Sequence, residues 1–338
     1  MKTFLRYALP LGLAGFLLWL AYKDMDFGQM WTDIQKAHII PIVLTFITTM
    51  LAHLFRALRW NMLFHPVGYQ PSVKSSFLAV MSGYFANLII PRAGEVTRCT
   101  VLTTSEKIPI QTSIGTVLAE RGLDLVMLGL IALTAFAVEY QTLSDFLIAQ
   151  KAKFGSPASS DGYDLKIIFL SAIVLFGGLL FIFRKVLMQI PFVAKVLEFI
   201  KGLVDGLLSV TRLRNPVLFL VYTILIWGGY YFTTYFSLSM FDFTFDLGFK
   251  AAFMLLIIGS FGIVVPVPGA VGGPFQLFVG AALVELYMKE PNISFTAASM
   301  MYWTQTFFTL VVGGLCYLLS VVMANQKIDE EKPVEAHV

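Results

Sequence analysis

The sequence has few charged residues for its length. Only 13% of its 338 residues are Asp, Glu, Lys or Arg, whereas 57% are hydrophobic, and the mean hydropathy is +0.77. Soluble domains carry about 25% charged and about 45–50% apolar residues, so this composition excludes an ordinary soluble domain. The formal net charge of only +3 also argues against nucleic acid as a partner. We therefore predict an integral membrane protein.

Patterns typical of catalytic and metal sites are missing as well. Cys99 and Cys316 lie in apolar surroundings without CxxC spacing and are interpreted as core residues. The four histidines are scattered, and the chain contains no H-E-x-x-H motif. We expect no cofactor, no metal site and no enzyme activity.

Apolar runs long enough to cross about 30 Å of hydrocarbon, roughly 20 residues as a helix, are abundant. We predict six transmembrane helices, near residues 4–22, 38–60, 114–140, 165–184, 216–240 and 296–323. The first run follows two basic residues but lacks a clear A-x-A-like cleavage site, so an uncleaved helix is favoured over a secretory signal. The predicted fold class is therefore an all-α polytopic membrane protein.

Two further apolar stretches, 75–105 and 250–287, are interrupted by IIPRAGEV and VVPVPGAVGGPF. Broken backbone at membrane depth must be buried in protein or line a wet cavity, because each unpaired peptide group facing lipid costs several kcal/mol. Both stretches are predicted to be re-entrant helical hairpins. The residues expected to bend or gate them are Pro91, Gly94, Pro266, Pro268, Gly269, Gly272 and Gln276.

Lysine and arginine gather on the cytoplasmic side of membrane proteins, so their positions indicate orientation. With both termini inside, sixteen of these residues fall in cytoplasmic segments and seven in outer segments. The two hairpins then enter from opposite faces at corresponding positions of two halves, which is typical of an inverted-repeat transporter. We expect a multi-pass protein of the cytoplasmic (inner) membrane with its N-terminus and C-terminus in the cytoplasm.

The predicted organisation is one integral membrane domain over residues 1–325, with halves at 1–140 and 215–325. Between the halves, residues 186–214 carry apolar residues at near-helical spacing with Lys195, Glu198, Lys201 and Asp205 between them, which predicts an amphipathic helix on the cytoplasmic surface. A plain linker helix packed on the domain fits this pattern equally well. The polar residues 326–338 are expected to form a disordered cytoplasmic tail.

The first group of charged residues lies in HLFRALRW, where His53, Arg56 and Trp60 share one helix face. Arg59 lies one turn beyond Arg56. It fits either the same polar face or the end of a span, where an arginine extends to the lipid headgroups and only sets the topology.

The second group lies in GYFANLIIPRAGEVTR, which is expected to bend at Pro91 and Gly94. A helix that restarts there points free N–H groups at the bend, and Arg92 and Arg98 would add charge suited to phosphate. Glu95 is expected to pair with an arginine, because a lone carboxylate in hydrocarbon is costly. The alternative is a salt bridge that only locks the hairpin.

The third group lies in LAERGLDL, where Glu120 and Asp124 are one helical turn apart and Arg121 lies between them in sequence. These three residues could neutralise one another. Alternatively, the acids pair with arginines of the other groups and leave at least one arginine for a ligand. The three groups hold five arginines and three carboxylates. If all eight face one cavity, the surplus of two positive charges would match a phosphomonoester, or a phosphodiester plus one structural arginine.

Together these motifs resemble the integral membrane family named after the transmembrane region of lysylphosphatidylglycerol synthase, also described as flippase-like. The matching residues are Arg56, Arg59, Trp60, Gly83, Tyr84, Asn87, Pro91, Arg92, Gly94, Glu95, Arg98, Glu120, Arg121, Asp124, Pro266, Pro268 and Gly269. The resemblance implies a lipid-translocating membrane domain without the soluble aminoacyl-transferase domain of the synthase. Relatives often carry a Glu where this chain has Gln276, so an acid that could carry a proton or an ion is missing there.

The leading hypothesis is a flippase that translocates an anionic lipid, such as a phospholipid or a polyprenyl-phosphate-linked lipid, across the cytoplasmic membrane. The candidate substrate-binding residues are Arg56, Arg59, Asn87, Arg92, Glu95, Arg98, Glu120, Arg121 and Asp124. The alternatives are an intramembrane enzyme acting on a lipid-linked substrate and a non-transporting scaffold for envelope assembly. Anionic membrane lipids are the expected partners, and a homo-oligomer or proteins of envelope biosynthesis are compatible with the sequence.

Overall fold

The computed structural model describes residues 12, 15–90, 93–145, 213–264 and 272–330, and every regular element within these ranges is a helix. The α-helices are α2 (Phe27–Ile34), α3 (Ile39–Phe64), α4 (Val73–Ile89), α5 (Gly94–Glu106), α6 (Ile110–Val138), α11 (Pro216–Leu238), α12 (Asp242–Phe245), α13 (Gly248–Val264), α14 (Pro274–Glu285) and α15 (Pro291–Glu330). A short 3-10 helix, η1 (His65–Val67), continues α3. The all-α prediction is confirmed for the described residues.

Four of the described helical segments are long and apolar enough to cross a membrane. They are Ile39–Val67, Ile110–Val138, Pro216–Leu238 and Pro291–Gln326, at the positions of four of the six predicted spans. Many of their large apolar side chains are exposed, which suits contact with lipid tails. The protein is therefore a multi-pass membrane protein. Of the other two predicted spans, 4–22 is described only in part, and 165–184 lies outside the described residues.

Local sequence signals explain where several helices begin. The helices α11, α14 and α15 start at Pro216, Pro274 and Pro291, because a proline at the first helical position lacks only an N–H that would be unpaired there anyway. Asn215 also caps α11, since its side chain accepts a hydrogen bond from the backbone N–H of Leu218 at 3.1 Å.

The residues of the first predicted hairpin form two helices that pack on each other, with a break at the expected place. α4 ends at Ile89 and α5 begins at Gly94. The two backbones approach so closely that a Cβ on Gly83 would lie 2.8 Å from the carbonyl oxygen of Gly94. The Asn87 side chain accepts a hydrogen bond from the Gly94 N–H at 2.7 Å, which stabilises the start of α5. Pro91 and Arg92 lie outside the described residues.

The second predicted hairpin corresponds to α13 and α14, which also pack on each other. A Cβ on Gly262 would lie 2.7 Å from the Cα of Phe275, so glycine allows this close approach. Gly272 and Gly273 have φ angles of 71° and 99°, which other residues rarely adopt. The buried Gln276 side chain accepts from the Gly273 N–H at 2.7 Å and closes the first turn of α14.

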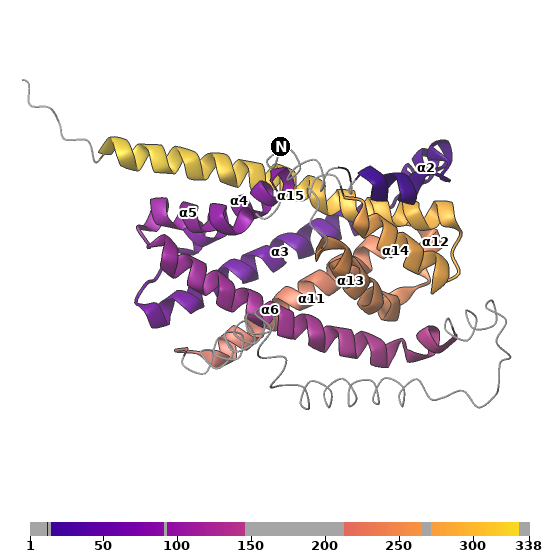
Figure 1. Ribbon diagram of the computed structural model, residues 1–338, viewed down its shortest axis with the longest axis horizontal. Helices are drawn as coiled ribbons and strands as arrows, with labels where there is room; N and C mark the ends of the chain where they lie inside the picture. Colours follow the sequence, from indigo (N-terminus) through magenta and orange to yellow (C-terminus); the bar gives the residue numbers. More distant parts are fainter. Residues whose placement is uncertain (1–11, 13–14, 91–92, 146–212, 265–271, 331–338) are drawn as a thin grey trace, which may run out of the picture.

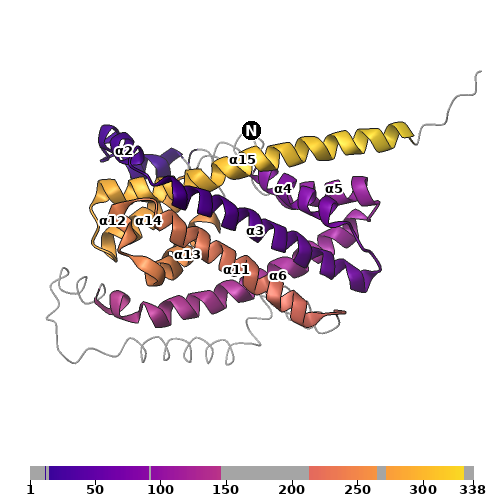
Figure 2. The ribbon, with the colours of Figure 1, turned by 180° about the vertical axis from the view of Figure 1, so that it is seen from behind.

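Three residues of the second bend, Pro266, Pro268 and Gly269, lie outside the described residues. Whether either hairpin re-enters the membrane remains a prediction. Figures 1 and 2 show the α4–α5 pair toward one end of the long axis and α12, α13 and α14 toward the other. Helix α15, 40 residues long and thus about 60 Å, runs along the bundle and packs on both pairs.

The predicted boundary of the C-terminal tail is wrong, because α15 continues past residue 325 to Glu330. Residues 326–330 include Gln, Lys, Ile and Glu, which extend an existing helix without the cost of nucleating one. Residues 331–338 and nearly all of the predicted amphipathic segment 186–214 lie outside the described residues. Both cysteines are buried, as predicted.

The packing of α3 against α11 gives a direct stability test. A Cβ on Gly229 of α11 would lie 2.8 Å from the Cβ of Ala52 in α3, whereas a Cβ on Gly228 would meet nothing within 4 Å. Gly229→Ala is therefore expected to overpack this contact and to destabilise the protein by about 1–3 kcal/mol. Gly228→Ala should leave stability unchanged or raise it slightly. Thermal unfolding in detergent measures both, and equal effects of the two substitutions would contradict this packing.

Candidate functional site

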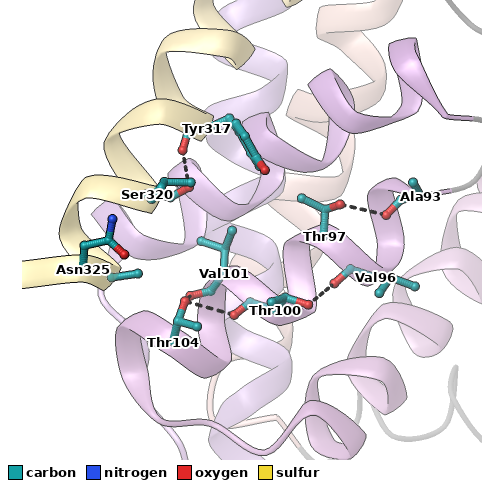
Figure 3. Close-up of a pocket in the computed structure, with 11 residues that line it drawn as sticks. Ala93, Val96, Thr97, Thr100, Val101, Thr104, Tyr317, Ser320 and Asn325 are labelled. Carbon is teal, nitrogen blue, oxygen red and sulfur yellow. Dashed lines mark hydrogen bonds between the residues drawn. The ribbon is translucent and has the colours of Figure 1, made fainter. Parts of the chain in front are cut away.

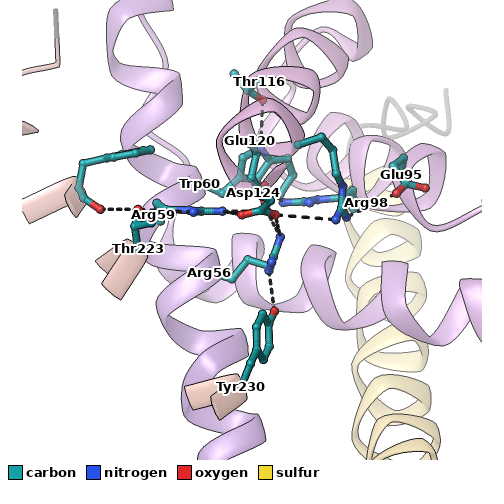
Figure 4. Close-up of polar contacts among 12 residues, drawn as sticks. Arg56, Arg59, Trp60, Glu95, Arg98, Thr116, Glu120, Asp124, Thr223 and Tyr230 are labelled. Carbon is teal, nitrogen blue, oxygen red and sulfur yellow. Dashed lines mark hydrogen bonds and ion pairs between the residues drawn. The ribbon is translucent and has the colours of Figure 1, made fainter. Parts of the chain in front are cut away.

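Charged side chains from three helices meet inside the bundle (Figure 4). They form the group that we call the ionic cluster, Arg56 and Arg59 of α3, Arg98 of α5, and Glu120 and Asp124 of α6. The three arginines and Glu120 are buried, and the Asp124 side chain is nearly so. The motifs that the sequence distributes over almost 70 residues thus converge on one site.

Glu120 is the centre of the ionic cluster. One carboxylate oxygen of Glu120 accepts a hydrogen bond from Nη1 of Arg56, and the other accepts from Nη2 of Arg98 at 2.8 Å. Nη2 of Arg59 lies 3.6 Å from Oε1 of Glu120. Glu120 therefore connects α6 to both α3 and α5.

Asp124, one turn further along α6, joins the two arginines of α3. Its Oδ2 accepts from Nη1 of Arg56 at 2.8 Å, and its Oδ1 accepts from Nη2 of Arg59 at 2.7 Å. Buried charges cost several kcal/mol each unless they are paired and hydrogen-bonded, and these contacts meet that condition. With three arginines and two carboxylates, the ionic cluster keeps a surplus of one positive charge.

Aromatic and hydroxyl side chains surround the arginines. The guanidinium carbon of Arg98 lies 3.8 Å from the ring centroid of Trp60, a favourable cation–π geometry. The Trp60 Nε1 donates to the hydroxyl of Thr116 at 3.0 Å. On the other side, the Arg56 Nε donates to the hydroxyl of Tyr230 in α11 at 3.2 Å. These contacts hold the rings and guanidinium planes in fixed orientations.

A second, more exposed ion pair lies beside the ionic cluster, and we call it the outer pair. Nη2 of Arg121 is 3.4 Å from Oε1 of Glu95, and the two side chains are 41% and 39% exposed. Both residues line a small cleft of about 10 Å³, roughly the room for one water molecule, together with Arg98 and Asn87. The outer pair is thus the most exposed part of the charged site.

The structure decides between several alternatives that the sequence left open. Arg59 is fully buried and paired with Asp124, so its interpretation as a residue that extends to the headgroups is wrong. Glu120 and Asp124 pair with arginines of α3 and α5, so a patch neutralised mainly by Arg121 is also wrong. Arg121 instead pairs with Glu95, and its Nη1 lies 3.9 Å from Oδ2 of Asp124.

Two more predicted site residues have other surroundings. Asn87 is held by its hydrogen bond to the start of α5, so it positions the hairpin while also lining the small cleft. Gln276 lies in the second hairpin and binds its own helix turn rather than the ionic cluster. His53, which shares the face of Arg56, is buried with its ring 4.4 Å from that of Tyr84.

Sequence reasoning missed Thr116, Thr223 and Tyr230, which support the ionic cluster. Thr223 accepts a weak hydrogen bond of 3.4 Å from Arg59. The only signal for Tyr230 was a hydroxyl in the apolar run of α11, and that run holds several others. Nothing in one sequence indicates which of them faces α3.

The helical architecture and the buried ionic cluster define a polytopic α-helical membrane protein with a charged centre. The chain belongs to the family described as the lysylphosphatidylglycerol synthase TM region, whose model matches residues 7–313. It is also similar to the UPF0104 membrane protein MJ1595 of Methanocaldococcus jannaschii, with 32% identity over 108 residues. That match covers 31% of this chain and about a third of the relative, 32%. No solved structure matches the chain.

Proposed function

We propose that the chain is a flippase that moves an anionic, phosphate-bearing lipid across the cytoplasmic membrane and performs no chemistry on it. The observation that carries this proposal is the ionic cluster, with its surplus positive charge and the more exposed outer pair beside it. Guanidinium groups bind phosphate through parallel hydrogen bonds, which makes a phosphate headgroup the best matched anion. Membership in a family named for a phospholipid-related membrane region supports the same substrate class.

The two parts of the charged site are assigned different roles in this proposal. Arg56 and Arg59 are held by Glu120 and Asp124 on the buried side, so they act mainly as structure. Arg121 and Arg98 lie at the small cleft, and the buried Nε of Arg98 has no hydrogen-bond partner in the described part of the chain. A lipid phosphate would replace Glu95 as the partner of Arg121 and use this free donor.

Exchange of one anion for another limits the energetic cost of binding. Arg121 already has a counter-ion in Glu95, so a phosphate that displaces this carboxylate does not bring an unpaired charge into the bundle. When the phosphate leaves, Glu95 returns to Arg121. In this role Glu95 promotes release, and the outer pair is part of the transport cycle rather than a permanent lock.

Mass spectrometry of the lipid that co-purifies with the protein in mild detergent tests the substrate class. We expect phosphate-bearing lipids with net negative charge to be enriched over their share of the membrane extract. Recovery of zwitterionic lipids in their ordinary membrane proportion, with no enrichment of anionic ones, would contradict the proposal. A spiked zwitterionic lipid in the same preparation serves as the control.

The proposed orientation places both termini in the cytoplasm, with α4–α5 entering from the cytoplasm and α13–α14 from outside. The location of the two pairs toward opposite ends of the bundle supports alternating access to a site between them. The bases of the two hairpins include the exposed residues Val67, after α3, and Met288, after α14.

Cysteine labelling checks this orientation. Val67→Cys is expected to react with a membrane-impermeant maleimide only from the cytoplasmic side, and Met288→Cys only from outside. The native Cys99 and Cys316 are buried and should give little background. Labelling of both introduced cysteines from the same side would rule out hairpins that enter from opposite faces.

A further inference from the structure

A groove of about 510 Å³ lies between α5 and the C-terminal part of α15 (Figure 3). This volume is in the range of small-molecule sites, about 300–1,000 Å³. Its lining shares no residue with the small cleft of the charged site, although α5 contributes to both. The groove therefore calls for an explanation separate from the binding of phosphate.

The α5 wall of the groove carries a row of threonines. Thr97, Thr100 and Thr104 follow one another at spacings of three and four residues, which places them on one face of the helix. Each hydroxyl donates its hydrogen to a carbonyl of its own helix, with Thr97 bound to Ala93 and Thr100 bound to Val96 at 3.0 Å each. The hydroxyl hydrogens of these threonines are thus not available for a hydrogen bond to a ligand.

On the facing wall one hydroxyl has the same property, whereas two other lining groups, the Tyr317 hydroxyl and the Asn325 amide, can donate hydrogen bonds. Ser320 of α15 donates its hydroxyl hydrogen to the carbonyl of Tyr317 at 2.7 Å. A hydroxyl has one hydrogen and two lone pairs, so Ser320 and the threonines present mainly acceptor lone pairs to the groove. A ligand that suits these walls carries hydrogen-bond donors for the threonines and Ser320 and an acceptor for Tyr317 or Asn325, and hydroxyl groups supply both.

The residues around the groove also indicate the charge and solubility of the ligand. Among the described residues that line the groove there is no Asp, Glu, Lys or Arg, so these residues offer a charged headgroup no counter-ion. The edges are apolar and exposed, with Val96 on α5 and Val321 on α15, next to Leu318. Leu318 and Val321 lie near the end of a helix that is long and apolar enough to span a membrane, which would place the groove at the level of the lipid headgroups.

We propose that the groove between α5 and α15 binds a neutral membrane lipid whose headgroup carries several hydroxyl groups, such as a sugar on a diacylglycerol. The headgroup hydroxyls donate to Thr97, Thr100 and Ser320, and the acyl chains lie along the apolar edges. This site differs from the charged site in both position and chemistry. Binding there depends on neither phosphate recognition nor transport.

Lipid binding to the full chain in detergent tests the proposal with two probes. The first is a short-chain monoglucosyl diacylglycerol, and the second is the same lipid with each sugar hydroxyl replaced by fluorine. Fluorine is close to a hydroxyl in size but cannot donate a hydrogen bond. We expect the free sugar to bind about tenfold or more tightly, the effect of a few ordinary hydrogen bonds.

A matched pair of variants tests whether the threonines of α5 bind the headgroup. The double substitution Thr97→Val and Thr100→Val removes two acceptors but keeps the branched shape, and it should weaken binding of the glucosyl lipid about tenfold. Thr103→Val is the control, because Thr103 makes the same kind of hydrogen bond, to Cys99 at 3.0 Å, but does not line the groove. It should bind as the wild type does.

Three results would overturn the proposal: equal affinity for the two probes, unchanged affinity of the double variant, or no binding of the glucosyl lipid to the wild type. Equal affinity would mean that the groove holds acyl chains only. The comparison of probes uses the wild type alone, so it remains informative even if a variant is unstable. Because both probes are uncharged, the outcome is independent of whether the protein transports anionic lipids.

Discussion

Glu120→Gln is expected to lower the unfolding temperature of the protein in detergent by on the order of 10 °C. Glutamine has nearly the same shape as glutamate but no charge, so Arg56 and Arg98 would lose their shared counter-ion inside the bundle. Breaking a buried ion pair on one side costs about 3–5 kcal/mol, because the remaining charge stays buried. Thermal unfolding followed by size-exclusion chromatography measures the change.

An exposed ion pair provides the control for this prediction. Asp246 and Lys289 are 2.8 Å apart, but the Asp246 side chain is 66% exposed, so Asp246→Asn should cost less than about 1 kcal/mol. Adding Arg98→Met to Glu120→Gln removes one unpaired charge and should restore part of the lost stability. If Glu120→Gln unfolds at the wild-type temperature, the ionic cluster does not hold the three helices together.

Substitutions in the outer pair are expected to change the affinity for anionic lipid in opposite directions. Arg121→Gln removes a phosphate partner and should weaken binding about 10-fold to 100-fold, since a hydrogen bond to a charged group contributes about 1.5–3 kcal/mol. Glu95→Gln removes the competing carboxylate and should strengthen binding. Because both side chains are partly exposed, neither variant should unfold the protein. Titration with phosphatidylglycerol in detergent measures the affinity.

Two observations would separate this assignment from a purely structural one. Phosphatidylcholine serves as the control lipid, and its affinity should change less than that of phosphatidylglycerol in either variant, because its choline ammonium neutralises the charge of its phosphate. If the outer pair is a salt bridge that only locks the hairpin, Glu95→Gln and Arg121→Gln should both lower stability. Neither substitution should then change the affinity for either lipid. Opposite shifts for the anionic lipid are expected only if Glu95 competes with it.

Hydropathy and the Pro and Gly positions were sufficient to predict much of the fold. The four described spans coincide with long apolar runs, because the length needed to cross a bilayer is encoded locally. The break between α4 and α5 could likewise be predicted from the local sequence, since Gly94 permits a close backbone approach that a side chain would block. The end of α15 was missed because polar residues that favour helix can continue it beyond the hydrophobic part.

The sequence analysis named all five residues of the ionic cluster as candidates, but it did not predict which of them pair with each other. Sequence spacing placed Glu120 and Asp124 on one face of a helix, but which arginines meet them depends on how α6 is rotated against α3 and α5. The same limit applies to Tyr230, because tertiary packing alone selects it. The groove could not be predicted at all, since it brings together residues more than 200 positions apart in the chain.

Transport in reconstituted liposomes tests the central proposal most directly. Fluorescent phosphatidylglycerol, a labelled polyprenyl phosphate and phosphatidylcholine are placed in separate proteoliposomes, and their arrival in the outer leaflet is followed by chemical quenching. The account predicts that the wild type moves at least one of the two phosphate-bearing anionic lipids faster than phosphatidylcholine, and that Arg121→Gln loses this difference. Movement of neither anionic lipid above the rate in protein-free liposomes would contradict it.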